Sequence, residues 1–344
     1  MVSVVAIIFS CESSERIQRV TDADLFMGIK EYADRMELDI SKIEDPLFLY
    51  DIYKADLKGD KKQIKESLLE YIENDSTKGF PYWLLGKYYS DGDSLIPDNA
   101  DTAILYYTKA IENMDDDEPN KAVAYNNRGP EKYELKDYKG AIADYDSAIL
   151  LRLSYAEAFN NRGNAKGNLE DYRGAIMDFD RAIELKPDYA EAFNNRANAE
   201  KKLERYENAI EDYNRAIDLK PDYAEAFYNR GTMKYELEDY KGAMEDFDEA
   251  IRLNPDLVEA FANRGIAKLK LKDYEGAIAD FDESIRLKPD FAEAFYNRGV
   301  AKAKLGKYEE AIEDFEKAIR LKPDYADAKH NREIARKKLK EQGK

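Results

Sequence analysis

Cysteine, histidine and tryptophan each occur once in the 344 residues, as Cys11, His330 and Trp83. A single cysteine excludes an internal disulfide and any metal cluster built from cysteines. His330 lies far from Cys11 along the chain, and the sequence has no glycine-rich phosphate loop or nucleophile elbow. We therefore expect a protein that is not an enzyme and that uses no cofactor or metal.

Positive charge is also in short supply. The chain has 54 Lys and Arg against 72 Asp and Glu, for a net charge of −18. Residues 1–121 carry −12 and residues 122–325 carry −10, whereas residues 326–344 carry +4. So acidic a body argues against a phosphate-backbone partner, and we expect no nucleic acid to bind. Apolar runs are short, so we expect no transmembrane segment.

What the sequence does contain is a repeat of 34 residues. Its clearest copy runs from Ala156 to Tyr189 and reads AEAFNNRGNAKGNLEDYRGAIMDFDRAIELKPDY. Further copies begin at Ala190, Ala224, Val258 and Ala292, and a looser one begins at Ala122, which makes six in tandem. A fixed period of this length indicates a solenoid, in which each unit buries its apolar face against its neighbours. Positions 1 to 34 below are counted from the start of each copy.

Each copy predicts two helices. Apolar or small residues recur at positions 3, 4, 8, 10 and 14 and again at 20, 21, 24, 27, 28 and 30. Spacings of three and four place such residues on one helical face. Gly163 and Ala175, at positions 8 and 20, allow the two backbones to approach closely. Asp171 is expected to cap the second helix, and Pro187 to end the unit.

This pattern resembles the tetratricopeptide repeat: an aromatic residue at position 4, small residues at 8, 20 and 27, aromatics at 17 and 24, and proline at 32. The resemblance covers residues 122–325 and implies an all-α, right-handed α-solenoid of antiparallel helix pairs. It also implies a concave groove that binds a protein or peptide partner. The predicted function is therefore an interaction scaffold for an extended segment. The alternative is a structural or assembly protein that acts through its ends while the groove is idle.

The candidate peptide-binding residues follow from position 6, which faces the groove in this family and is Asn in every copy. An amide can accept from and donate to one peptide unit of an extended ligand. The candidates at this position are Asn127, Asn161, Asn195, Asn229, Asn263 and Asn297, and Asn331 continues the series in the last helix. Positions 5 and 9 add Asn160, Asn164, Asn194, Asn198, Tyr228 and Tyr296. The competing interpretation is that the amides orient helix packing.

Two other sets of residues are assigned to structure. Glu at position 2, as in Glu191, follows an acidic or Ser residue by three, so a capping box is expected with Asp188. Some relatives clamp the carboxylate end of a chaperone tail with Lys at positions 2 and 5 and Arg at position 6. Those cations are missing here, so that function is not expected.

Arg replaces the family's usual Leu at position 7, and Asp recurs at position 23. Two pairings are open: Arg162 with Asp178 inside one repeat, or Asp178 with Arg196 of the next. We favour the pairing between repeats, because position 23 lies on the same helix face as position 27, which is expected to meet the next repeat. Pro130, at position 9 of the first copy, is expected to kink or break its helix near Asn126.

The amino-terminal residues lack the repeat. Residues 1–11 contain an apolar run followed by Cys11 and resemble the end of a lipoprotein signal, although no basic residue precedes the run. An apolar arm with a free cysteine is the alternative. Cys11 is thus a candidate lipidation site and lipid anchor, and the protein is expected to be cytoplasmic, or membrane-anchored and exported if Cys11 is lipidated.

The predicted organisation has five parts. Residues 1–11 form the signal remnant or arm, and residues 12–79 a helical region with helices at Asp22–Met36, Asp45–Lys58 and Lys61–Ile72. Residues 80–121 resemble a Sel-like or degenerate unit followed by an acidic linker. Residues 122–325 form the six tetratricopeptide units, and residues 326–344 a basic capping helix.

Overall fold

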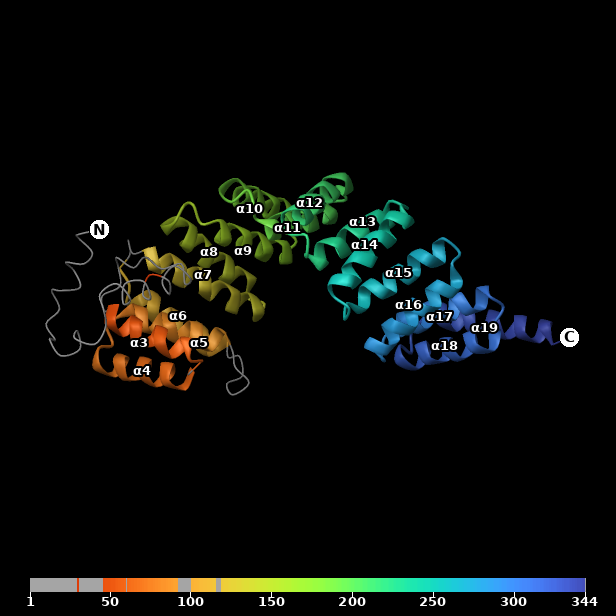
Figure 1. Cartoon of the computed structure of the whole chain (residues 1–344), viewed down its shortest axis with the longest axis horizontal. Helices are drawn as coiled ribbons and strands as arrows, with labels where there is room; N and C mark the ends of the chain where they lie inside the picture. Colours follow the sequence, from red (N-terminus) through yellow and green to blue (C-terminus); the bar gives the residue numbers. More distant parts are fainter. Residues whose placement is uncertain (1–29, 31–45, 60, 92–99, 116–118, 344) are drawn as a thin grey trace. The chain divides into compact units, whose positions relative to one another are not determined.

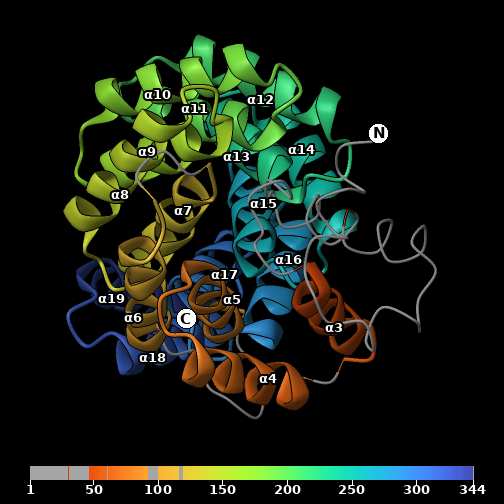
Figure 2. The same cartoon turned by 90° about the vertical axis from the view of Figure 1, so that its left-hand side faces the viewer.

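A computed structural model of the chain describes residues 30, 46–59, 61–91, 100–115 and 119–343. Over these ranges the regular structure is helical, without strands. The chain divides into two compact units, an amino-terminal unit of residues 1–187 and a carboxyl-terminal unit of residues 188–344. Figures 1 and 2 show the helices of each unit in successive antiparallel pairs. The expected all-α solenoid of helix pairs is confirmed.

The amino-terminal unit contains the helices that precede the repeat and the first two full copies. Its described helices are α3 (Pro46–Leu57), α4 (Lys61–Asn74), α5 (Gly79–Ser90), α6 (Ala100–Glu112), α7 (Pro119–Glu134), α8 (Tyr138–Leu151), α9 (Ala156–Asn168) and α10 (Tyr172–Leu185). Each full copy therefore supplies a first helix over positions 1–13 and a second over positions 17–30, as the sequence predicts; only α7 begins earlier.

The carboxyl-terminal unit contains the other four copies and the last helix. Its helices are α11 (Ala190–Lys202), α12 (Tyr206–Leu219), α13 (Ala224–Glu236), α14 (Tyr240–Leu253), α15 (Val258–Lys270), α16 (Tyr274–Leu287), α17 (Ala292–Lys304), α18 (Tyr308–Leu321) and α19 (Ala326–Gln342). Helix α19 packs on α18 as a first helix would, and no second helix follows it within the described residues.

Close packing at positions 8 and 24 joins the helices of a pair. A Cβ atom added to Gly163 would lie 2.6 Å from Cε1 of Phe179, so glycine is what lets α9 approach α10. Ala175 and Ala182, on the facing side of α10, are fully buried. The small residues in the repeat are therefore explained by helix contact.

The turn between the helices of a pair carries two special positions. Glu170, at position 15, has a φ of 64°, a left-handed conformation that L-residues adopt at a steric penalty. The side chain of Asp171 then accepts a hydrogen bond of 2.9 Å from the backbone N–H of Gly174, which confirms the predicted cap. Two copies lack this cap, and in both the Asp and the Gly are replaced together: Arg205 with Asn208, and Lys307 with Glu310.

Pro130 does not break its helix, so the break expected near Asn126 is wrong, while the kink expected there stays a prediction. Helix α7 runs unbroken from Pro119 to Glu134 with the proline inside it. The ring of Pro130 is exposed, whereas Gly129 and Glu131 on either side are buried. Packing of these neighbours holds the helix together across the missing N–H donor.

The helices before the repeat are partly confirmed. Helix α3 begins at Pro46 and α4 at Lys61, as predicted, and Ile52 and Leu68 are buried between them and α5. Leu57, the last residue of α3, is 62% exposed. The helix predicted at Asp22–Met36 lies outside the described residues apart from residue 30, and residues 1–11 with Cys11 lie wholly outside them.

Helices α5 and α6 form a pair that packs like a repeat. Gly86 meets the ring of Tyr107 as Gly163 meets Phe179, with an added Cβ 2.6 Å from the ring. The connection between α5 and α6 is much longer than the three-residue turn inside a full copy. This pair is therefore a helix hairpin with the same close contact and a longer connection along the chain.

Candidate functional site

The candidate site lies on the first helices of the repeats. First helices of successive pairs touch one another inside each unit, as α7 touches α9 and as α13 touches α15. Their side chains at positions 2, 6, 9 and 13 are mostly half-buried or exposed, with spacings that put them on one side of each helix. We call this surface the first-helix face. The predicted binding residues at positions 6 and 9 lie on it.

Most of the position-6 amides are already hydrogen-bonded within the chain. Each donates from Nδ2 to the position-5 side chain of the preceding copy. The bonds run from Asn161 to Asn126 (3.3 Å), from Asn229 to Asn194 (3.2 Å), from Asn263 to Tyr228 (3.1 Å) and from Asn331 to Tyr296 (3.0 Å). Asn127 likewise bonds the hydroxyl of the deeply buried Tyr107. The asparagine series therefore links one repeat to the next.

The remaining candidates divide by burial. Asn160, Asn194 and Asn229 are buried, with 5%, 0% and 8% of their surface exposed, so a ligand has little access to them. Asn198 accepts a 2.6 Å hydrogen bond from the Tyr213 hydroxyl. Asn164 is half-buried, and Asn160 and Asn195 each make a further interaction inside the protein. The half-buried Tyr228 and Tyr296 are the acceptors for Asn263 and Asn331.

Asn297 is the exception in the carboxyl-terminal unit. Residue 262, at position 5 of the preceding copy, is Ala and offers no side-chain acceptor. Asn297 is half-buried, and its side-chain amide makes no hydrogen bond to any residue that the structure describes. Its donor and acceptor groups are therefore available to a ligand, which the sequence series alone did not distinguish.

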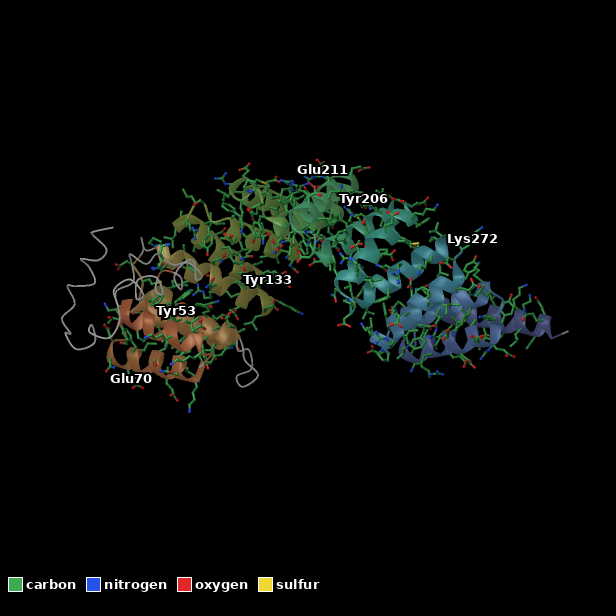
Figure 3. All side chains as sticks on the ribbon, viewed as in Figure 1. Tyr53, Glu70, Tyr133, Tyr206, Glu211 and Lys272 are labelled. Carbon is green, nitrogen blue, oxygen red and sulfur yellow. The ribbon has the colours of Figure 1, made fainter. Side chains whose placement is uncertain are left out.

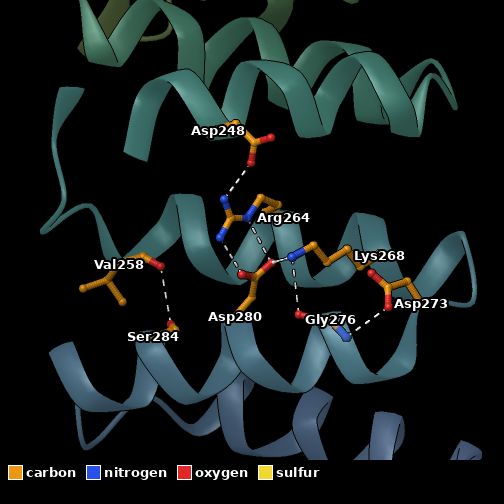
Figure 4. Close-up of polar contacts among 8 residues, drawn as sticks. All are labelled: Asp248, Val258, Arg264, Lys268, Asp273, Gly276, Asp280 and Ser284. Atoms are coloured by element: carbon orange, nitrogen blue, oxygen red, sulfur yellow. Dashed lines mark hydrogen bonds and ion pairs between the residues drawn. The ribbon is translucent and has the colours of Figure 1, made fainter. Parts of the chain in front are cut away.

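The arginine at position 7 pairs inside its own repeat, so the favoured pairing was wrong. Arg264 donates from Nε and Nη2 to the two carboxylate oxygens of Asp280, at 3.0 and 2.6 Å (Figure 4). Its third nitrogen, Nη1, donates to Asp248 of the preceding copy at 2.6 Å. The same pairing recurs in the other copies: Arg128 with Asp144, Arg162 with Asp178, Arg196 with Asp212, Arg230 with Asp246 and Arg298 with Asp314.

Position 25, which sequence reasoning overlooked, supplies the contact between repeats. Arg332 of the last helix pairs with Glu333, and Arg336 reaches Glu316 at position 25 instead. Lys268 adds a second cation on Asp280, at 2.8 Å. Burial alone would lower the pKa of Arg264, but hydrogen bonds to Asp280 and Asp248 outweigh it and raise that pKa above its ordinary value. These ion pairs are structural and leave no charge for a ligand.

The glutamates at position 2 do not form the predicted capping boxes. Tyr189, the residue before α11, occupies the cap position and makes no side-chain cap bond. Glu191 instead pairs at 3.0 Å with Lys220, at position 31 of its own copy, and Glu157 pairs at 3.1 Å with Lys186. The backbone turns one residue later than the sequence pattern suggested, so Asp188 is too early to cap.

A pocket opens on the first-helix face between α13 and α15. It has a volume of about 100 Å³ and is lined by Thr232, Tyr235, Glu236, Phe247, Asn263 and Ile266. Sequence reasoning named only Asn263 of this set. The available signal was position 9, which changes along the array from Asn198 through Thr232 to Ile266.

Other surfaces carry solvated charge. Glu70, Glu211 and Lys272, labelled in Figure 3, are exposed charged side chains on α4, on α12 and in the turn before α16. Within the described ranges, His, Cys, Asp and Glu nowhere gather in threes as a metal site requires. In the same ranges no helix is both long and apolar enough to cross a membrane.

Comparison with known proteins confirms that the chain carries tetratricopeptide repeats. The family described as tetratricopeptide repeat matches residues 156–189, 224–257 and 292–325, and a second, described as TPR repeat, matches residues 197–235 and 267–306. No curated protein matches the sequence. Proteins built from such repeats generally mediate protein–protein interactions and act as non-catalytic scaffolds.

Solved structures of other proteins are similar to this chain to different degrees. The chain covers 99% of the pilF protein of Pseudomonas aeruginosa over 63% of its own length, with a TM-score of 0.57 and 18% identity, which shows the fold alone. YrrB, reported as a TPR protein with an unusual peptide-binding site, is 28% identical with a TM-score of 0.49; the match covers 55% of this chain and 97% of that protein. MamA is 23% identical, with a TM-score of 0.46, over 50% of this chain and 94% of its own.

Proposed function

We propose that this protein is a non-catalytic scaffold that binds an extended segment of a protein partner on the first-helix face of its carboxyl-terminal unit. The observation that carries the proposal is the half-buried Asn297 amide, which has no hydrogen-bond partner in the described structure. Such an amide can hold both the N–H and the C=O of one peptide unit. The exposed acidic residues nearby suit a protein segment better than nucleic acid.

The remaining position-6 amides contribute through their unused groups. Asn263 gives one N–H to Tyr228, which leaves its second N–H and its oxygen available on a half-buried side chain. Asn161 is in the same situation in the amino-terminal unit. The proposed ladder is therefore discontinuous, with Asn297 as its strongest member and buried Asn229 as its weakest.

Asn297→Ala and Asn229→Ala form a matched pair of variants for testing this proposal. Asn297→Ala removes ligand contacts but no contact inside the protein, so partner affinity should fall roughly tenfold while the stability is unchanged. Asn229→Ala removes the bond to Asn194 and should lower stability by about 1 kcal/mol while affinity stays the same. Isothermal titration against a protein partner captured by pull-down measures the affinity, and urea unfolding measures the stability. Unchanged affinity for Asn297→Ala would reject the site.

A structural or assembly role is the second candidate. It is favoured by the use of four position-6 amides in bonds between repeats. In that case the partner would contact the ends of the array, and the basic helix α19 is the described end. Charge reversal at the exposed Lys337 and Lys340 would then weaken binding, and Asn297→Ala would not.

The finer assignments complete the proposal. The α5–α6 pair is a Sel-like unit, supported by its longer connection and the Gly86–Tyr107 contact, and the described helices α3 and α4 cover the amino-terminal end of the array. Residues 326–344 cap the opposite end.

Cys11 carries a lipid anchor. Metabolic labelling with an alkyne fatty acid would mark the parent chain but not the Cys11→Ser variant. Equal labelling of both chains would reject this assignment.

A further inference from the structure

We propose that the pocket between α13 and α15 is an anchor site for one aliphatic side chain of the bound segment, with a lysine or arginine beside it. This inference rests on the proposed function, because it specifies what the same face recognises. The anchor would fix the register of a ligand that backbone contacts alone leave free to slide.

The pocket has the size of an aliphatic side chain. Its volume of about 100 Å³ equals roughly three water molecules, which is room for the three or four carbons of valine, leucine or isoleucine. Two of the residues that line the pocket, the fully buried Phe247 and the half-buried Ile266, are apolar.

Three polar side chains of the pocket, unlike Glu236 at its rim, already have partners. Thr232 donates from Oγ1 to the backbone oxygen of Tyr228 at 3.0 Å, and Asn263 donates to the Tyr228 hydroxyl at 3.1 Å. The hydroxyl of Tyr235 interacts with Lys270. Apart from the second N–H and the oxygen of Asn263, these groups offer a polar ligand little, whereas an aliphatic group loses nothing by displacing water from between them.

The charge around the pocket favours a basic neighbour. Glu236 is exposed at the rim and has no ion pair with any described residue, and Glu225 and Glu259 are exposed on the same face. Two cations face this region. Lys270 interacts with Tyr235. Burial lowers the pKa of Lys201 below its ordinary value, and nearby Glu236 opposes this effect. Glu236 is therefore the carboxylate that a basic neighbour would meet at the rim, and Glu225 and Glu259 make the rest of this face acidic.

The test uses synthetic nine-residue peptides with leucine between two lysines in a Gly/Ser/Thr background. Methyl NMR of the full chain should show the Ile266 signal shifting while Val300, at the same position of the last repeat, shifts little. Replacing the leucine by alanine should weaken binding roughly fiftyfold, since each buried CH₂ contributes about 0.8 kcal/mol. Replacing the lysines by glutamates should abolish the shift.

Two variants keep the outcome interpretable. Thr232→Leu fills the pocket and should remove binding of the leucine peptide, whereas Val300→Leu, the same residue introduced at the same position of the last repeat, should leave it intact. If leucine and alanine peptides bind equally and still perturb the first-helix face around Asn297, the anchor is rejected and the proposed function stands. If no peptide and no captured partner perturbs this face, both are rejected.

Discussion

Removing Asp280 should destabilise the carboxyl-terminal unit far more than removing Asp248, although Arg264 binds both. Asp280 has a side chain only 4% exposed and holds Arg264 and Lys268, whose side chains are 18% and 17% exposed. Asp280→Ala leaves two like charges facing each other without their shared carboxylate. Breaking a buried pair costs about 3–5 kcal/mol, and the bond that Arg264 keeps to Asp248 reduces this to roughly 2–4 kcal/mol.

Asp248→Ala is the matched control. The Asp248 side chain is 58% exposed, and exposed ion pairs contribute about 0–1 kcal/mol. Urea unfolding followed by far-ultraviolet circular dichroism measures both variants, and hydrogen exchange locates the loss in α15 and α16. Salt in the molar range should remove the effect of Asp248→Ala but little of that of Asp280→Ala. Equal and small losses for both variants would refute the reasoning.

Three further predictions concern local structure. Pro130→Ala should raise stability by up to about 3 kcal/mol in urea unfolding, because the exposed ring contributes little packing and the N–H donor returns; a lower midpoint would contradict this. Gly276→Glu should destabilise the parent chain, because a Cβ at residue 276 would lie 2.2 Å from Asp273 Oδ2. The same substitution should be tolerated in an Asp273→Lys background, since Lys307 and Glu310 occupy these two positions in the last copy. A double-mutant cycle without coupling between the two sites would count against this prediction. Burial, with Glu293 next in effect, raises the pKa of Tyr325 from 10.0 to about 12, so its contribution to stability is present below pH 10 and lost as the pH rises toward 12. Tyr325→Phe should flatten that alkaline loss in thermal unfolding, and an unchanged slope would disprove the assignment.

The period of the sequence predicted the helices almost completely. The contact between positions 8 and 24, as between Gly163 and Phe179, can be predicted directly from the residue types. The aromatic ring at position 24 fits only because the residue at position 8 is small. The cap at Asp171 and the end before Pro187 follow from single residues whose local chemistry is sufficient. Such features depend on neighbours within one repeat.

Contacts between repeats were harder to predict. Asp178 lies at similar distances along the chain from Arg162 and from Arg196, so spacing alone does not choose between them. The structure pairs Asp178 with Arg162. The same limit applies to the asparagines. Their regular recurrence fits a ligand ladder and a bond between repeats equally well, and only the side chain at position 5 tells the two apart, as Ala262 does for Asn297.

The bond from position 25 to the next arginine makes the junctions interchangeable. Asp248 meets Arg264, and Asp282 meets Arg298, each at 2.6 Å. Deleting residues 258–291, one whole copy, would bring Asp248 to Arg298 with the same chemistry on both sides. Duplication or loss of a 34-residue block would therefore keep the contact from position 25 at the new junction, whereas the bond from position 6 to position 5 depends on which copies meet, as Ala262 shows. The number of copies can then change without a compensating substitution in this contact.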